Sequence, residues 1–504
     1  MGQGPGGALL TATYGKRVFA LALAGGFYAA AALAEWHSDV AVRRATGIVL
    51  ATLVLWISEV APLGVVALAI PVAALFAGVL TWDEALAAWG DPIIFLFLGA
   101  FLLARALDKF GAFDWIVSGR WARTSEAGGA VGLTLAVLVL SGAVSTVQNN
   151  TAVTAMLLPV VTTLASRTRF AGMVLLGLAF GSTFGGMATP VGTAPNFLGY
   201  AEMKRLDPSI NFVSWLRVGI PVWVGAMAIG WGVLAVARAL ARPGRAGQYV
   251  TNAAPDTSRG TGAAAVVEPR PAFAPDPESF PLDESARRTG RLWALILFGV
   301  AALAWLTMGL VLALTPTGSP ADRWIAAYLP ESLVPLAAAW VLFIVPVDPR
   351  GRTVLDRRDF AAIDWDTLFL IAGGLCLGKL LKESGAAAAL AHAVCGLQAP
   401  SAGLMLALAG ATVLLSELTS NTATAALMVP LAGALAPALG CSPVQAIWLV
   451  ALSASLGFAL PISTPPNAIV YGTRLVRLRL MIGAGVAVDL LCAAWVVGCI
   501  RWFA

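Results

Sequence analysis

Long apolar runs recur along the chain, separated by short polar segments. Most of these runs are close to the roughly 20 residues that a helix needs to cross a bilayer. The pattern predicts eleven membrane-spanning helices, at 17–34, 44–60, 63–81, 92–108, 171–190, 212–241, 289–315, 326–346, 363–382, 444–461 and 480–503. We expect helices because a helix satisfies its own backbone hydrogen bonds in lipid.

Two further apolar segments, 127–166 and 401–438, are about twice as long and carry polar residues at their midpoints. Each is long enough to enter the membrane and return to the same side. A polar turn at membrane depth is tolerated only where it lines a cavity inside the protein. We therefore predict two re-entrant helical hairpins whose polar tips face a binding site.

The composition is typical of a membrane protein. Of the 504 residues, 59% are hydrophobic and only 12% are charged, whereas soluble domains have about 25% charged residues. The alternating strands of a membrane barrel are absent, so the predicted fold class is an all-α polytopic membrane protein. The net charge of +5 is better explained by membrane topology than by nucleic-acid binding. We expect the lipid bilayer and a small solute as partners, and no nucleic acid.

The two polar tips are copies of one motif. Asn150 is followed nine residues later by Pro159, and Asn421 is followed nine residues later by Pro430. A shift of 271 residues relates the two tips. The same shift relates a second pair of motifs, matching Thr193, Pro195 and Asn196 with Thr464, Pro466 and Asn467. One Ser-Asn-Thr or one Pro-Asn is usually only a polar kink, but duplication in a single register indicates a functional site.

The repeat extends over both halves of the chain. With a shift of 274, Phe95, Leu96 and Gly99 match Phe369, Leu370 and Gly373. Each half then has five spans, and an odd number makes the halves enter the membrane from opposite sides. The predicted organisation is an N-terminal segment with one extra span (1–43), repeat 1 (44–241), a linker (242–288) and repeat 2 (289–504). The linker is rich in Pro, Gly and Arg, and we predict that it is cytoplasmic and disordered.

The distribution of positive charge gives the orientation. Most Lys and Arg residues of the predicted loops fall on one side when the N-terminus is placed in the cytoplasm. An excess of Lys and Arg marks the cytoplasmic side of a membrane protein. We therefore predict a multi-pass protein of the cell (inner) membrane, with its N-terminus in the cytoplasm and its C-terminus on the extracytoplasmic side.

Inverted repeats with broken helices are typical of secondary transporters, which bind their substrate near the membrane midplane. Helix N-termini at the hairpin tips direct unpaired N–H groups at the cavity, which favours an anion. The side-chain oxygens of the tips and freed backbone carbonyls suit a hard cation such as Na⁺. Pro195, Pro465 and Pro466 cannot continue a helix, so we expect them to break the spans that face the hairpins.

These motifs resemble those of the divalent anion/Na⁺ symporter family, which includes dicarboxylate, citrate and sulfate carriers. The resemblance rests on Ser420-Asn421-Thr422 with Glu417 ahead of it, on Asn150-Thr151, and on segments 192–196 and 464–467. It covers nearly the whole chain outside the first 15 residues and the linker. It implies a homodimer in which each protomer has a scaffold domain and a transport domain that moves as an elevator.

The resemblance also implies the residues of the site. Those expected to contact the substrate are Asn149, Asn150, Thr151, Thr193, Ser420, Asn421, Thr422, Thr464 and Pro465. Two Na⁺ sites are implied, the first at Ser145, Asn149, Asn150 and Gly192, and the second at Ser420, Asn421, Ser463 and Thr464. The expected structural residues are Pro195, Asn196, Pro466, Asn467 and Glu417, the last of which would orient Asn421 or a loop amide.

Asn149 departs from the family pattern, which usually has Ser at this position. An Asn oxygen can still bind Na⁺, but the side chain is bulkier, so two modes of transport stay open. Uptake of a dianion against a potential of about −100 mV costs about 4.6 kcal/mol, and each entering Na⁺ returns about 2.3, plus about 1.4 for a tenfold gradient. Symport therefore needs at least two Na⁺, whereas exchange of one dianion for another needs none. The regular second tip favours symport.

The substrate class stays open within the family. We expect a small divalent anion, foremost a C4-dicarboxylate, with sulfate, citrate or tartrate as alternatives. A channel lined by the hairpins is a rival of a different class. An enzyme is disfavoured, because no predicted span carries a cluster of His, Asp and Glu with metal-ligand spacing or a base beside a nucleophile.

Overall fold

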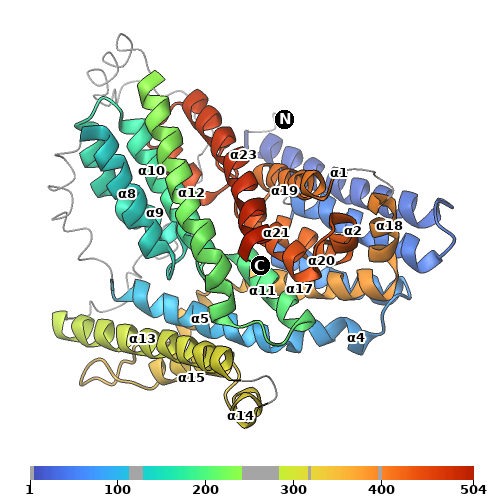
Figure 1. The fold of residues 1–504 in the computed structure, drawn as a ribbon, viewed down its shortest axis with the longest axis horizontal. Coiled ribbons are helices and arrows are strands. Elements are labelled where there is room, and N and C mark those ends of the chain that lie inside the picture. The colour runs from blue at the N-terminus through green and yellow to red at the C-terminus, as the bar shows by residue number, and fades with distance from the viewer. Residues whose placement is uncertain are drawn as a thin grey trace.

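The computed structural model describes residues 5–58, 60–112, 129–240, 283–315, 319–395 and 400–503 (Figure 1). These residues form helices, joined by loops that contain one isolated β-bridge between Pro346 and Thr353. Eight helices in this part of the chain are long and apolar enough to cross a membrane. The prediction of an all-α polytopic membrane protein is confirmed.

The first half contains an extra N-terminal helix and then the elements of repeat 1. They are α1 (Pro5–Leu33), α2 (Val40–Ser58), α3 (Leu63–Phe76), α4 (Trp82–Leu86), the 3₁₀ helix η1 (Ala87–Gly90), α5 (Pro92–Lys109), α8 (Gly129–Ser145), α9 (Asn150–Ser166), α10 (Ala171–Met187), α11 (Ala194–Leu206) and α12 (Phe212–Leu240). Asp91 caps α5 by accepting a hydrogen bond from the Ile93 N–H (3.0 Å), and Pro92 fits the first helical position because it has no N–H to satisfy.

The second half repeats this order. Its helices are α13 (Glu284–Leu314), α14 (Pro320–Tyr328), α15 (Leu333–Leu342), α16 (Arg357–Ala361), α17 (Trp365–Glu383), α18 (Ala386–Cys395), α19 (Ser401–Leu418), α20 (Asn421–Leu439), α21 (Pro443–Ala454), α22 (Pro465–Gly472) and α23 (Leu478–Phe503). The predicted span 326–346 is instead the end of α14 and the whole of α15, because the chain breaks at Pro330. Residues 284–288, assigned to the linker, belong to α13, and 242–282 lie outside the described residues.

Contacts between the halves occur in repeat-related pairs. Helix α3 packs against α17, and α5 packs against α15; α10 contacts α22, and α11 contacts α21; α12 contacts α23. Glycines permit the first two contacts. A Cβ on Gly99 would lie 2.5 Å from the Pro335 backbone carbon, and a Cβ on Gly373 would lie 2.5 Å from the Ala67 Cβ. The two glycines are the matched residues of the 274 shift, so the close approaches follow the internal symmetry.

The two hairpins lie on opposite sides of α12 and α23 (Figure 1). In Figure 1, α8, α9 and α10 gather to the left of α12, α19, α20 and α21 lie to the right of α23, and α5, α13, α14 and α15 run along the lower edge. Residues 173–187 of α10 and 446–454 of α21 are all buried, so these two helices form the centre. Helix α9 packs against α22 and α11 packs against α20, which brings each hairpin against the broken helix of the other half.

Candidate functional site

Tip 1, residues 146–151, joins α8 to α9. The Ser145 hydroxyl donates a hydrogen bond to the Asn150 Oδ1 atom (2.6 Å). Asn149 is the N-cap of α9, and its Oδ1 atom accepts hydrogen bonds from the backbone N–H groups of Thr151 (2.8 Å) and Ala152 (3.4 Å). The Ser145 hydroxyl therefore fixes the orientation of the Asn150 side chain. Thr151 and Asn150 remain only half-buried.

Loop 1, residues 188–193, faces tip 1. The Thr189 hydroxyl donates to the Thr146 carbonyl (2.8 Å), which ties the loop to the tip. The Asn196 Nδ2 atom donates to the carbonyls of Gly186 (2.8 Å) and Thr189 (2.7 Å), and so fixes the end of α10. A Cβ on Gly186 would lie 2.7 Å from the Asn150 Oδ1 atom. Gly186 therefore lets the Asn150 side chain lie directly against the break between α10 and α11.

Tip 2, residues 417–422, repeats these contacts. The Ser416 hydroxyl donates to the Asn421 Oδ1 atom (2.7 Å), as Ser145 does to Asn150. The Asn467 Nδ2 atom donates to the carbonyls of Gly457 (3.2 Å) and Leu460 (3.0 Å). All of these residues are related to those of the first half by the shift of 271. Ser416 was absent from the predicted site, although its match with Ser145 could have indicated it.

Loop 2, residues 455–464, is held by acidic side chains that have no equivalent in the first half. Glu417 accepts hydrogen bonds from the backbone N–H groups of Ala459 (2.7 Å) and Leu460 (3.1 Å), and also from the Ser463 hydroxyl. The structure thus places Glu417 on loop amides and on a predicted Na⁺ ligand. The residue at the matching position of tip 1 is Thr146.

Asp489 adds a second carboxylate behind loop 2. It lies on α23, is 4% exposed, and accepts a hydrogen bond from the Phe458 N–H (3.3 Å). Sequence reasoning did not include it. The available signal was a single carboxylate within the apolar run 480–503, because an ionisable residue inside a membrane span is rare and usually functional.

The TxPN motifs begin the second parts of the broken spans. Pro195 lies in the first turn of α11, and Pro465 and Pro466 lie in the first turn of α22, where a missing N–H costs nothing. Thr464 caps α22 by accepting from the Asn467 N–H (3.3 Å). Thr193 occupies the same position before α11 without a side-chain cap.

Each half-site contains a buried oxygen that nothing in the described structure satisfies. The Oδ1 atoms of Asn196 and Asn467 have no hydrogen-bond partner among the described residues, and both side chains are 0% exposed. Buried carbonyl oxygens are nearly always paired. At the tips, the hydroxyls of Ser145 and Ser416 and the side-chain oxygens of Asn150 and Asn421 are hard oxygen donors. Na⁺ and other hard cations bind to donors of this kind.

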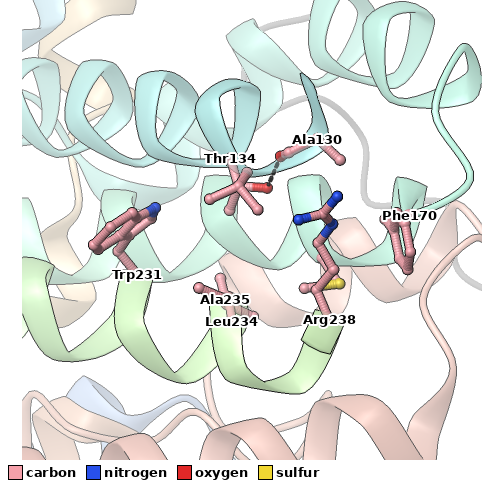
Figure 2. Close-up of a pocket in the computed structure, with 9 residues that line it drawn as sticks. Ala130, Thr134, Phe170, Trp231, Leu234, Ala235 and Arg238 are labelled. Atoms are coloured by element: carbon pink, nitrogen blue, oxygen red, sulfur yellow. Dashed lines mark hydrogen bonds between the residues drawn. The ribbon is translucent and has the colours of Figure 1, made fainter. Parts of the chain in front are cut away.

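The groove at the start of α8 is a different feature. It lies between Ala130, Thr134, Phe170, Trp231 and Arg238 (Figure 2), and the Arg238 guanidinium lies 5.3 Å from the centre of the Phe170 ring. It has no room for a water molecule, and no motif residue lines it. We therefore exclude it as a solute site.

The family of the chain follows from comparison with known proteins. A family model described as citrate transporter matches residues 53–452. The chain belongs to the citrate transporter family. This confirms the resemblance to the dicarboxylate, citrate and sulfate carriers, and it makes the chain a multi-pass membrane transporter rather than an enzyme.

Similar proteins of the family include two bacterial transporters. The chain is 28% identical over 463 residues to the "Sodium-dependent dicarboxylate transporter SdcS" of Staphylococcus aureus, covering 87% of this chain and 81% of that protein. It is also 28% identical over 449 residues to an "Uncharacterized transporter" of Haemophilus influenzae, covering 87% of each. A solved structure, the Alcanivorax borkumensis YdaH transporter, aligns with 16% identity and a TM-score of 0.48 over 86% of this chain and 88% of that one.

Proposed function

We propose that the chain is a carrier of a small divalent anion, foremost a C4-dicarboxylate, that is driven into the cell by Na⁺. The observation that carries this proposal is the pair of matched Ser–Asn hydrogen bonds, Ser145 to Asn150 and Ser416 to Asn421. Each pair lies at the start of a helix and against a broken span. The name of the S. aureus relative supports both the substrate class and the ion.

The anion would bind between the two tips. The first turns of α9 and α20 have side-chain donors at Thr151 and Thr422, and no Lys or Arg lies in either motif. Neutral donors and helix N-termini bind an anion without leaving a fixed buried charge when the site is empty. Such a site releases its substrate, as a carrier must in each cycle.

Oxygen donors near the two predicted positions support the proposed Na⁺ binding. At the first, the oxygens of Ser145 and Asn150 lie 2.6 Å apart, and the Asn150 Oδ1 atom and the Gly192 carbonyl both lie against Gly186. At the second, Ser463 and Thr464 belong to the loop that Glu417 holds. In that arrangement, Na⁺ would neutralise part of the substrate charge and order the loop. A dianion carried with three Na⁺ would move one positive charge inward, which the membrane potential favours by about 2.3 kcal/mol at about 100 mV.

We further propose an elevator-type movement in a homodimer of the cell membrane, with the N-terminus in the cytoplasm. The proposed transport unit comprises the hairpins α8–α9 and α19–α20 with the broken spans α10–α11 and α21–α22. Helix α20 packs closely on α17, where a Cβ on Gly378 would lie 3.3 Å from the Pro430 Cβ. The repeat-related helices α9 and α5 make no comparable contact, and Ala155 and Pro159 of α9 are exposed. The opposite-facing state would pack α9 on α5.

Two cysteine pairs test the movement. Gly378→Cys with Pro430→Cys should cross-link in the present state, and the matched pair Ala104→Cys with Pro159→Cys should cross-link in the other. Both belong in a background from which the five native cysteines have been removed. Formation of the second pair in proportion to added substrate supports the movement, and its complete absence contradicts it.

Uptake into proteoliposomes tests the coupling. We expect labelled succinate to accumulate under an inward Na⁺ gradient and to stop when choline replaces Na⁺. Uptake that persists in choline but requires internal dicarboxylate would replace symport by exchange. Competition by citrate, tartrate and sulfate, measured in the same vesicles, ranks the substrate class. Saturable counterflow separates either carrier from a channel.

A further inference from the structure

A buried carboxylate lies at the junction between the transport unit and the helices beside it. Glu331 is 8% exposed and stands in the short break between α14 and α15. It accepts hydrogen bonds from the Tyr200 hydroxyl (2.5 Å), from the Lys204 ammonium (2.6 Å) and from the Phe212 N–H (3.4 Å). Tyr200 and Lys204 are on α11, and Phe212 begins α12. One carboxylate thus accepts from two side chains of the transport unit and from the first N–H of α12; we call Tyr200, Lys204 and Glu331 the junction cluster.

The backbone of Glu331 is attached to the opposite side. The Trp305 indole of α13 donates to the Glu331 carbonyl (3.0 Å). The same indole stacks on Phe212, with ring centres 5.2 Å apart and an angle of 17° between the planes. Glu331 is therefore fixed to α13 and α15, and its side chain reaches across to α11.

A second ion pair lies close by but is more exposed. Arg205, the neighbour of Lys204, contacts Asp91 at the start of α5 (2.7 Å), with side-chain exposures of 35% and 20%. Glu202 also contacts Arg205 (3.6 Å). Exposed pairs of this kind contribute little. The Glu331 carboxylate is the buried member, and removing one partner of a buried pair is costly because it leaves the other charge uncompensated.

A cavity of about 320 Å³ adjoins both pairs and gives them space to separate. Lys204, Arg205, Glu331 and Asp91 all line it, together with apolar side chains of α5 and α13. The cavity is large enough for water, which can solvate the four charged side chains as they part. The two ion pairs can therefore separate without leaving a charged side chain that has neither a partner nor water around it.

Among the described residues, the other half of the chain has no equivalent cluster. The residue matched to Tyr200 is Tyr471, which is 36% exposed and makes no side-chain hydrogen bond in the described structure. The residue matched to Lys204 is Leu475. Leu475 cannot form an ion pair, so a symmetric exchange of the two halves, which would give the opposite-facing state, produces no second lysine–carboxylate pair. The interaction stabilises one state only.

We propose that Glu331 is a positioning residue that holds the transport unit in the present state through Tyr200 and Lys204, and so biases the carrier toward this state. This inference rests on the elevator movement proposed above. Glu331 touches neither tip, so it acts on the distribution of states and not on the substrate contacts.

The test measures the two cysteine cross-links in full-length protein carrying Glu331→Gln. We expect the ratio of the Gly378→Cys/Pro430→Cys product to the Ala104→Cys/Pro159→Cys product to fall at least tenfold, which corresponds to about 1.4 kcal/mol. Lys204→Gln should shift the ratio in the same direction. The charge-reversed double variant, Lys204→Glu with Glu331→Lys, should restore part of the ratio. Arg323→Gln, which changes an exposed cation on α14, is the matched control.

The outcomes separate this role from its alternatives. A residue that only supports folding would lower both cross-links together and lower the melting temperature without rescue by charge reversal. An unchanged ratio in both Glu331→Gln and Lys204→Gln, with both pairs forming in the parent protein, overturns the role of Glu331 and leaves the movement intact. Failure of the second pair in every protein, parent included, overturns the movement and this inference with it.

Discussion

Tip 1 and tip 2 hold their asparagines in the same way but begin their second helices differently. At tip 1, Asn149 occupies the Thr151 and Ala152 N–H groups with its own side chain. At tip 2, Ser420 makes no side-chain capping bond to α20. The first N–H groups of α20 are therefore available to an anion, whereas two of those of α9 are already used.

The loops that face the tips also differ in the number of backbone N–H groups that they leave outside a helix. Helix α10 continues to Met187, whereas α21 ends at Ala454, four residues earlier in the repeat register. The extra unwound turn of loop 2 frees backbone N–H groups from helical hydrogen bonding. Glu417 and Asp489 accept hydrogen bonds from these groups. Two half-sites built from one repeated motif thus have different donors, and we expect them to divide the work of binding anion and cation unequally.

The largest effect is expected from removing the shared element of both tips. Asn421→Ala and Asn150→Ala should each abolish transport, because each removes the amide that Ser416 or Ser145 positions. Uptake in proteoliposomes measures the loss, and size-exclusion chromatography checks that the protein remains folded. Ser166→Ala, an exposed change at the end of the first hairpin, is the control. Wild-type uptake by both asparagine variants would remove the site assignment.

A smaller effect is expected from the acid that only tip 2 possesses. Glu417→Gln leaves the Ala459 and Leu460 N–H groups and the Ser463 hydroxyl with one acceptor oxygen instead of two. Unsatisfied buried groups cost about 1–3 kcal/mol, so we expect the Na⁺ concentration for half-maximal uptake to rise about tenfold.

The matched change in the first half should have little effect on Na⁺ dependence. Thr146→Val removes only a hydroxyl bond to the Ala143 carbonyl (2.8 Å). Equal shifts for Glu417→Gln and Thr146→Val would contradict a special role for the acid.

The smallest effect is expected from making the two tips alike. Ser420 makes no capping bond in tip 2, so Asn149→Ser should free the Thr151 and Ala152 N–H groups and lower the stability by about 0.5–2 kcal/mol. Because the shorter side chain frees N–H groups of α9, the KM for a dicarboxylate should fall several-fold. Ser420→Asn should raise it. Substrate titrations of initial uptake rates measure both, and a change in the same direction for both variants would show that self-capping does not set the affinity.

Much of the fold could be predicted from the sequence. The predicted spans 212–241 and 480–503 correspond to α12 (Phe212–Leu240) and α23 (Leu478–Phe503) within two residues, since long apolar runs have one stable form in lipid. The prediction of one continuous helix over 326–346 was wrong. The high average hydrophobicity of this segment concealed the break at Pro330 and Glu331. The short α4 was missed because five residues give no periodic signal.

The sequence by itself determined which residues are equivalent. The shift of 271 placed Asn150 with Asn421 and Asn196 with Asn467, and in the structure each pair makes hydrogen bonds to residues at repeat-matched positions. That these residues bind substrate and Na⁺ stays a prediction. Equivalence could be read from the chain because matched local sequences make matched local turns.

Only the tertiary structure decided which contacts distinguish the halves. The contact of Glu331 with Tyr200 joins residues 131 positions apart, and Glu417 meets the Ala459 N–H 42 positions away. No periodicity or motif predicts contacts between residues so far apart in the sequence, because such contacts depend on how whole helices pack. The capping of α9 by the Asn149 side chain likewise depends on a rotamer that the residue type alone does not specify. The sequence contains both the internal symmetry and the substitutions that interrupt it, and packing decides which contacts those substitutions make.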